Sequence, residues 1–340
     1  MEYIRLGNTG LIVSKLSLGA MTFGSDPSMT SVYKVDEDNA NAMVRKALDA
    51  GINFFDTANG YSGGQSEIML GRALAEKRED VVIATKVGFR GSPAISASGL
   101  SRGQILSSCE GSLRRLGTDY IDLYIAHRDD IYTPLEETLE AFDLLVKTGK
   151  VRYIGFSNWP AWKVAKAVEL QKARGWAQFC SGQMHYSLVG RDVEYDVVPF
   201  MLDSGIGMTV WSPLAGGFLS GKYTRENLSD PENRLAGFDL IPFDKEAGFA
   251  VVEKLRAIAG AHQASVAQVA LAWLLHQPVV NSVIVGASKL AQLEDNLKAV
   301  EVKPSAEELA ELDEITRPRP LYPHWFNGMM VDAVHKTALG

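Results

Sequence analysis

The chain has 340 residues, of which 46% are hydrophobic, and this is typical of a folded α/β barrel with insertions rather than a disordered segment. Its formal net charge of −7 argues against a general nucleic-acid binder, which is normally basic. The first residues lack the apolar core of a signal peptide, and no apolar run approaches the roughly 20 residues that span a bilayer. We therefore expect a cytoplasmic protein without a membrane partner. The two cysteines, Cys109 and Cys180, form no CxxC pair, which argues against disulfides and metal sites.

Short apolar strands alternate with amphipathic helical stretches along the whole chain. The opening YIRLGNTGLIVSKL predicts a small hairpin around an Asn-Thr-Gly turn. Strands are then expected at about 16–20, 53–57, 81–86, 121–126, 151–156, 178–183, 207–211 and 282–287. Helices are expected at about 38–50, 65–77, 102–116, 135–148, 160–174, 193–204 and 289–300. This order predicts an α/β fold, a (β/α)8 TIM barrel, and the absence of a linker predicts one domain over residues 1–340.

Two segments depart from a minimal barrel. A long irregular stretch, about residues 212–246, follows the seventh strand, and long loops in compact domains are usually functional. The tail after about residue 303 contains RPRPLYPHWFNGMM, with Trp325 beside Phe326. We expect this tail to lie over the barrel mouth and to shape a substrate pocket.

Polar residues stand where six of the predicted strands end. In chain order they are Asp56, Lys86, His127, Asn158, Gln183 and Ser212. In a parallel barrel the carboxyl ends of the strands meet at one mouth, where active sites are built. We therefore expect these side chains to converge.

Tyr61 lies on a glycine-bearing loop just after Asp56 and completes a proton-handling group with Lys86 and His127. A tyrosine has a reference pKa of about 10, and a neighbouring ammonium such as that of Lys86 lowers this pKa by favouring the phenolate. Asp56 can hold the ammonium in place, while His127 can orient a carbonyl oxygen. This set would protonate a carbonyl oxygen while another group supplies a hydride to the carbon.

The chain resembles the aldo-keto reductases over nearly its whole length. The motifs that carry the resemblance are GNTGLIVSKLSLGAMTFG, FFDTANGYSGGQSEIMLGRAL, TKVG, SLRRLGTDYIDLYIAH, GKVRYIGFSN, YSLVGRDVE, WSPLAGGFLSGKY and VIVGASKLAQLEDN. The resemblance implies a catalytic tetrad of Asp56, Tyr61, Lys86 and His127, with Tyr61 as the general acid in the reducing direction. It also implies a small carbonyl or alcohol substrate and a protein that is a monomer or a homo-oligomer.

The resemblance further implies a nicotinamide cofactor site at the barrel mouth. The residues that would form it are Gly19, Met21, Thr22, Asp56, Ser157, Asn158, Gln183, Trp211, Ser212, Pro213, Leu214, Gly216, Lys222, Arg234, Gly286, Ser288, Lys289, Gln292, Asp295 and Asn296. Ser157, Asn158 and Gln183 would bind the carboxamide, and Trp211 would stack on the ring. Because Ser288 and Lys289 would face a ribose 2′-phosphate, NADP(H) is preferred. Family members that bind NADPH tightly often carry arginine where this chain has Gln292, which leaves NAD(H) open.

The substrate pocket is expected to be lined by aromatic residues. Besides Tyr61 and His127, it would draw on Phe23, Phe89, Trp159, the loop at Asp129 and Asp130, and the tail residues Trp325 and Phe326. Aromatic walls favour a hydrophobic carbonyl compound.

Three other interpretations are weighed against a reductase. GGFLSGKY at 216–223 approaches a phosphate-binding P-loop, but Tyr223 stands where that motif requires Ser or Thr. No GxGxxG follows the first strand, which disfavours a two-layer dinucleotide-binding dehydrogenase. The remaining alternative is a regulatory or sensor subunit that resembles potassium-channel β subunits and binds the cofactor with slow turnover. We predict NADPH-dependent reduction of an aldehyde or ketone.

Overall fold

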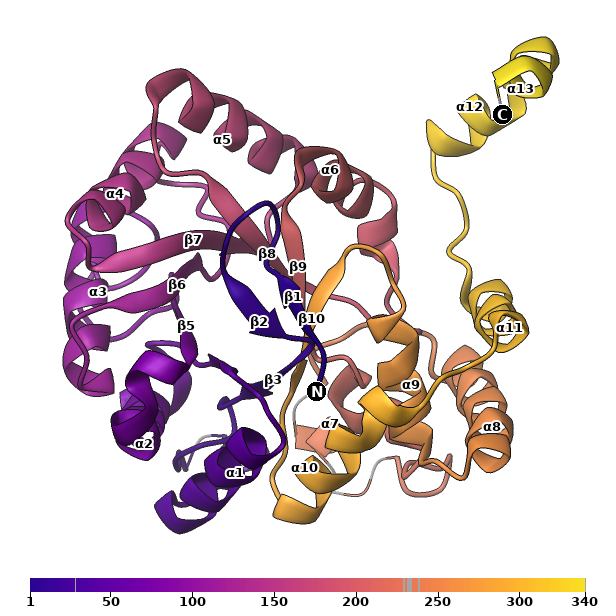
Figure 1. Ribbon diagram of the computed structural model, residues 1–340, viewed down its shortest axis with the longest axis horizontal. Coiled ribbons are helices and arrows are strands. Elements are labelled where there is room, and N and C mark those ends of the chain that lie inside the picture. Colours follow the sequence, from indigo (N-terminus) through magenta and orange to yellow (C-terminus); the bar gives the residue numbers. More distant parts are fainter. Residues whose placement is uncertain (28, 229, 231–233, 238, 340) are drawn as a thin grey trace.

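Eight parallel strands close into a barrel surrounded by helices in the computed structural model, which describes residues 1–27, 29–228, 230, 234–237 and 239–339 (Figure 1). Around the barrel the strands run β10-β3-β4-β5-β6-β7-β8-β9. Their bounds are β3 Leu16–Gly19, β4 Phe54–Asp56, β5 Val82–Val87, β6 Ile121–Ala126, β7 Val151–Ser157, β8 Phe179–His185, β9 Gly207–Trp211 and β10 Val280–Val285. The predicted (β/α)8 barrel is confirmed.

A hairpin closes the amino-terminal end of the barrel. Strands β1 (Tyr3–Arg5) and β2 (Ile12–Ser14) pair antiparallel, as the Asn-Thr-Gly turn predicted. Leu6 and Val13 are fully buried in a cluster with Phe54, Leu123 and Ile125 of the barrel strands. The hairpin therefore seals the bottom, and the site can open only at the other end.

Helices cover the outside of the barrel, and several begin at a side-chain cap. Asp36, Ser101 and Ser265 each accept a hydrogen bond from the first turn of the helix that follows, which satisfies an otherwise free backbone donor. The outer helices are α1 Glu37–Asp49, α2 Gln65–Leu74, α3 Arg102–Leu116, α4 Leu135–Lys147, α5 Ala161–Arg174, α6 Val197–Ser204, α8 Lys245–His262, α9 Val266–Leu275, α10 Leu290–Leu297 and α11 Ala306–Thr316. Of the helices that the structure describes, none alone combines the length and hydropathy of a bilayer span, and one pair, α8 with α9, passes only together across a 94° bend.

Strand alternation decides which side chains face the barrel interior. Along β5, Val82 and Ala84 belong to the inner cluster, whereas Ile83 and Val87 pack with the helices outside. Lys86 has the same parity as Val82 and Ala84, so it points inward at the mouth. The alternation along β5 therefore directs the Lys86 side chain toward the barrel axis.

The long loop after β9 contains short helices that the sequence did not predict. They are η4 (Ala215–Ser220) and α7 (Arg234–Gly237). Residues 229, 231–233 and 238 of the loop lie outside the described residues. The structure thus describes both ends of the loop, at β9 and α8.

The tail does not cover the barrel mouth, which corrects the sequence-based expectation. Residues 318–338 are almost all exposed, and helices α12 (His324–Met329) and α13 (Ala333–Leu339) lie beyond α11, clear of the barrel (Figure 1). The tail touches the body near its base, where the Tyr195 hydroxyl donates to the Arg319 carbonyl and His324 lies 3.5 Å from Asp196. Its apolar side chains have too little contact with the barrel to hold it over the mouth.

Candidate active site

An ion pair between the ends of two neighbouring strands forms the floor of the site. The Lys86 Nζ, completely buried, donates to Asp56 Oδ1 at 2.6 Å and to the Thr57 carbonyl at 2.7 Å. It also donates to the Tyr61 hydroxyl at 3.3 Å. Tyr61 begins the short helix η1 (Tyr61–Gly64), which follows β4 after a short turn. The structure brings together the three residues that the sequence predicted would meet.

The pKa values of Lys86 and Tyr61 are both raised, but for different reasons. Burial disfavours the charge on Lys86, but Asp56 and Tyr61 outweigh it, and the pKa of the ammonium is raised. Burial raises the pKa of Tyr61, and the opposing effect of Lys86 does not cancel it. The sequence-based expectation of a net lowering is therefore wrong for Tyr61. The phenol stays protonated at neutral pH, with a cation beside it.

His127 follows β6 and faces the tyrosine. Its ring is 5.6 Å from the Tyr61 ring and 4.5 Å from the Phe89 ring, in edge contacts with both. Burial, followed by the charges of Lys86 and Arg128, lowers the pKa of His127 well below its usual value. A neutral imidazole carries one N–H, so His127 can donate a single hydrogen bond to a carbonyl oxygen.

Polar groups behind the floor hold it in place; the sequence predicted Gln183 at this mouth, but not Glu67 and its partners. The Gln183 amide donates to Asp56 Oδ2 at 2.8 Å, so both carboxylate oxygens are engaged. Glu67, fully buried, accepts from Thr85 beside the lysine at 2.5 Å and from Arg115 at 2.6 Å. The sequence signal that could have predicted the Glu67–Arg115 pair is a glutamate on the inward face of a predicted helix.

Several non-glycine residues at the mouth adopt the left-handed backbone conformation, among them Asn158 and Ser212. Asn158 has φ 58° and Ser212 has φ 51°, each just past a strand end. The Asn158 amide donates to the carbonyl of His127 and to the Ser157 hydroxyl, and its Oδ1 accepts from the Trp211 Nε1 at 3.1 Å. Such conformations persist where surrounding bonds impose them and gather at ligand sites. Both positions were predicted to bind the cofactor.

The loop that leaves β9 folds back on itself at the mouth. The Ser212 hydroxyl accepts from the Gly216 amide at 3.1 Å, and Gly216 has φ 68°. Pro213 is buried and Leu214 half-buried between them. The predicted residues of this loop therefore form one compact turn beside Trp211.

Four cations gather beyond this turn, one more than the sequence analysis named. Burial, then the charges of Arg234, Lys34 and Lys289, lower the pKa of Lys222. A lysine whose ammonium is opposed by other cations lies in a positive field that attracts an anion. Lys34, on the loop between β3 and α1, was missed because nothing in its local sequence distinguishes it from a surface lysine.

Hydrogen bonds and close packing bring the three loops of this cation cluster together. The Lys34 amide donates to the carbonyl of Thr22, whose hydroxyl donates to the carbonyl of Ala287 at 2.7 Å. On the other side, a Cβ built at Gly237 would lie 2.8 Å from the Ser31 Cβ. The loop after β3 therefore lies between the loops after β9 and β10.

The remaining predicted cofactor residues lie at the same end of the barrel. The Ser288 amide and hydroxyl bond to Gln292 Oε1. The Asp295 carboxylate accepts hydrogen bonds from Ser265 at 2.6 Å and from Gln268 at 2.7 Å. Two of the hydrogen bonds that it can accept are therefore already made with residues at the N-terminus of α9. Gly19 ends β3, Met21 and Thr22 follow it, Gly286 follows β10, and Asn296 is buried on α10.

The structure brings together only some of the residues expected to line the substrate pocket, namely Tyr61, Phe89 and His127. Phe89 is 44% exposed beside His127, whereas Phe23 and Trp159 are buried. Asp129 pairs with Lys163, and the Asp130 carboxylate accepts from the Leu100 amide at 2.7 Å. Trp325, on α12, has ring contacts with Tyr322 and Phe326 of the tail. Trp325 therefore does not join His127 within this chain.

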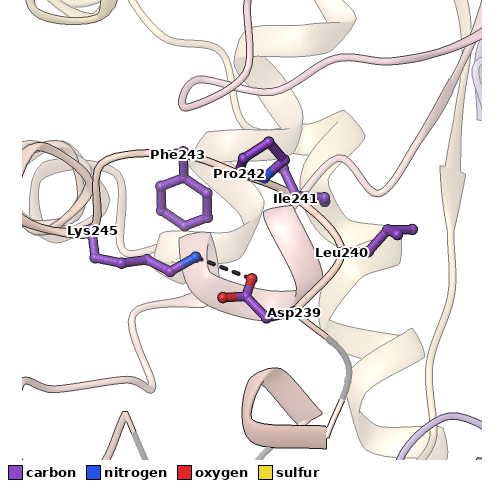
Figure 2. Close-up of a pocket in the computed structure, with 6 residues that line it drawn as sticks. All are labelled: Asp239, Leu240, Ile241, Pro242, Phe243 and Lys245. Carbon is purple, nitrogen blue, oxygen red and sulfur yellow. Dashed lines mark hydrogen bonds and ion pairs between the residues drawn. The ribbon is translucent and has the colours of Figure 1, made fainter.

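Two surface hollows lie away from the floor. One, of about 740 Å³, follows residues 239–245, where the Lys245 ammonium is 3.1 Å from Asp239 Oδ1 and 3.7 Å from the centre of the Phe243 ring (Figure 2). The other, of about 450 Å³, lies beside Lys34 and Gln65. The first contains none of the predicted site residues, and the second adjoins the cation cluster.

The chain belongs to the aldo/keto reductase family, whose model matches residues 15–317. It is 40% identical to the Bacillus subtilis (strain 168) protein named "Uncharacterized oxidoreductase YrpG", over 93% of this chain and 96% of that protein. It is 36% identical to versiconal hemiacetal acetate reductase of Aspergillus parasiticus, over 95% and 99% of the two chains. It is also 35% identical to a protein of Oryza sativa subsp. japonica named "Probable voltage-gated potassium channel subunit beta", over 94% and 98%.

Proposed function

We propose that this protein is an oxidoreductase that uses NADPH to reduce the carbonyl group of an aldehyde or ketone to an alcohol. The observation that carries the proposal is the pair of contacts that Lys86 makes beside His127: an ion pair with Asp56 and a hydrogen bond to the Tyr61 hydroxyl. The family match and relatives named as an oxidoreductase and a reductase support the reaction class.

The residues at the mouth fit a nicotinamide dinucleotide phosphate. A planar indole, Trp211, is fixed by Asn158 next to the floor and offers a face for ring stacking. Further out, Lys34, Lys222, Arg234 and Lys289 form a positive field of the kind that phosphates require. The reduced nicotinamide, when bound, supplies a hydride to the carbonyl carbon.

The protein's own groups handle the proton and the oxygen. Tyr61 donates its phenolic proton to the carbonyl oxygen as negative charge develops there. Lys86, 3.3 Å from that hydroxyl, stabilises the phenolate that remains, while Asp56 keeps the ammonium charged and fixed. His127, neutral and edge-on to Tyr61, orients the oxygen through its N–H. Phe89 beside it favours a hydrophobic carbonyl compound.

The test is NADPH consumption, followed by absorbance, with an aromatic aldehyde and an o-quinone as probes and NADH as the comparison cofactor. We expect turnover of at least one probe and a preference for NADPH. Equal rates with NADH would contradict the preference, because the cation cluster would then contribute nothing to discrimination.

A second candidate is a cofactor-binding regulatory subunit with slow turnover, which the relative from Oryza sativa subsp. japonica favours by its name. Tight NADPH binding without turnover of either probe would favour this candidate. Free exchange of cofactor during repeated turnover would exclude it.

A further inference from the structure

Arg128, a half-buried residue directly after His127, forms no ion pair with any carboxylate of the described residues. Its guanidinium donates to the Asp129 carbonyl at 3.4 Å and to the Ser98 hydroxyl at 3.3 Å. Both acceptors are neutral, and both distances are long for hydrogen bonds from nitrogen to oxygen. A guanidinium has five N–H donors, so these two contacts use only part of its donating capacity.

The other half-buried arginines that the structure describes either have a carboxylate partner or lie at the proposed cofactor site. The paired ones are Arg78 with Asp122, Arg115 with Glu67, and Arg191 with Glu194 and Asp313. Arg234 belongs to the cation cluster. A charge withdrawn from water costs free energy unless a partner compensates for it. Arg128 departs from this pattern, which indicates a counterion that comes from outside the chain.

One aromatic ring connects this guanidinium with the His127 imidazole. The Arg128 Cζ is 5.6 Å from the centre of the Phe89 ring, and the centre of the His127 ring is 4.5 Å from it. A molecule whose carbonyl oxygen is bound at His127 would therefore reach Arg128 across a spacer about as long as one aromatic ring. The positive charge also acts at the floor, since Arg128 is one of the causes that lower the pKa of His127.

The loop after β5 holds Arg128 in place. Gly88 has φ 143°, and a Cβ built there would lie 3.7 Å from the Arg128 Cγ and 3.6 Å from the His127 Cβ. Ser98, which accepts from the guanidinium, belongs to the same loop, and the Gly99 amide donates to the Gly88 carbonyl at 3.0 Å. The stem and the head of the arginine thus contact one closed loop beside the histidine.

The two carboxylates that follow Arg128 are already engaged elsewhere. Asp129 pairs with Lys163. The Asp130 carboxylate accepts from the amides of Leu100 and Tyr132 at 2.7 and 2.9 Å. Neither carboxylate is therefore the counterion of the neighbouring guanidinium.

We propose that the substrate of this reductase carries a carboxylate, which Arg128 binds while His127 and Tyr61 engage the carbonyl oxygen. The planar guanidinium matches the two oxygens of a carboxylate. One cation balances one negative charge, whereas a phosphate monoester carries about −1.5 to −2 at neutral pH and would exceed it. Because the Phe89 ring lies between the two binding groups, the expected class is an aromatic acid that bears an aldehyde or ketone. The inference rests on the proposed function, since it names the substrate class of that reaction.

A pair of probes that differ only in charge tests the proposal by turnover. They are p-formylbenzoate and p-formylbenzamide, reduced with NADPH. We expect the wild type to prefer the acid at least about tenfold in kcat/KM, and Arg128→Met to abolish that preference through a raised KM for the acid. Arg152→Met, which removes an exposed arginine beside Tyr120 at the closed end of the barrel, is the matched control and should keep the preference. Equal kcat/KM for acid and amide in the wild type would overturn the proposal.

A conservative variant separates anion binding from support of the loop. Arg128→Lys keeps the charge but loses the planar fork, so we expect an intermediate preference for the acid. If Arg128→Met instead lowered kcat/KM for acid and amide by the same factor, the arginine would serve only to hold its loop. That result would overturn the proposal.

A binding measurement keeps the test independent of turnover. If neither probe nor any other carbonyl is reduced, the proposed function fails, and calorimetry with p-hydroxymethylbenzoate and p-hydroxymethylbenzamide in the presence of NADP⁺ decides the carboxylate site alone. We expect the acid to bind at least about tenfold more tightly than the amide, and Arg128→Met to remove the difference. Equal binding of acid and amide would overturn the site, as would tighter binding of p-hydroxymethylphenyl phosphate than of the acid.

Discussion

The side chains of the catalytic floor are buried and hydrogen-bonded, whereas most side chains of the carboxyl-terminal arm, residues 317–339, are exposed to solvent. Lys86 is completely buried and donates to three oxygens, and Asp56 uses both carboxylate oxygens. The arm leaves Trp325 and Phe326 47% and 42% exposed. The side chains of the floor are enclosed within one chain, whereas those of the arm remain open to solvent. Chemistry at the floor should therefore be sensitive to single atoms, whereas single substitutions in the arm should change the stability of the barrel little.

The largest effect is expected when the cation of the floor, the Lys86 ammonium, is removed. Lys86→Met would leave the Asp56 carboxylate buried without its counterion, and breaking a buried pair in this way costs about 3–5 kcal/mol. We expect the free energy of unfolding, measured with denaturant, to fall by that amount and turnover to be lost. Lys172→Met, at an exposed pair on α5, is the matched control. A loss no greater than in that control would contradict a pre-formed floor.

The pH dependence of reduction should follow Tyr61. Its pKa lies above the ordinary value of about 10 because burial favours the neutral phenol. The protonated form is the acid, so kcat/KM for the carbonyl should stay level through neutral pH. It should fall about tenfold per unit once the pH exceeds the Tyr61 pKa. A fall that begins between pH 7 and 9 would show that Lys86 outweighs burial.

The cation cluster should contribute a smaller, cofactor-specific effect. Loss of one charge-assisted contact to phosphate costs about 1.5 kcal/mol, or roughly tenfold in affinity. We expect Lys289→Met to weaken NADPH binding by about that factor, measured by quenching of intrinsic fluorescence, and to leave NADH binding nearly unchanged. Lys34→Met tests the cation that sequence analysis missed. An equal loss for both cofactors would place the affected lysine at the pyrophosphate instead.

The smallest effect is expected on the stability of the barrel when the arm is altered. Phe326→Ala should change the free energy of unfolding by less than about 0.5 kcal/mol, measured with denaturant, because the side chain is half exposed. Phe54→Ala, at a fully buried ring in the barrel interior, is the contrasting variant and should cost about 3–5 kcal/mol. Similar losses for both would show that the arm packs on its own barrel.

Strand order and residue parity could be predicted from the sequence, because alternation and strand ends are local features. The meeting of Asp56, Lys86 and Tyr61 followed from these features alone. The direction of the arm could not be predicted, since it depends on the balance between weak contacts at Tyr195 and exposed apolar surface. The net shift of the Tyr61 pKa could not be predicted from the sequence either. It depends on the balance between burial, which raises the pKa, and the charge of Lys86, which lowers it, and burial is known only from the folded chain.

Lys34, in the cation cluster of the proposed cofactor site, could not be identified from the sequence either. Its position beside Lys222 results from backbone bonds to Thr22, which in turn is bonded to the end of β10. Such a link between residues far apart in the chain has no local signature. The family motifs located the loops after β9 and β10, but the third loop of the cluster became visible only in the fold.

The most direct test of the central claim is the turnover of Tyr61→Phe beside the wild type, with the dissociation constant for NADPH measured on both. Tyr120→Phe, at the closed end of the barrel before β6, is the matched control. The removal of one hydroxyl should lower kcat by at least roughly 10²-fold, the lower range of general acid catalysis, and leave NADPH affinity unchanged. Full turnover by Tyr61→Phe would contradict its role as the acid.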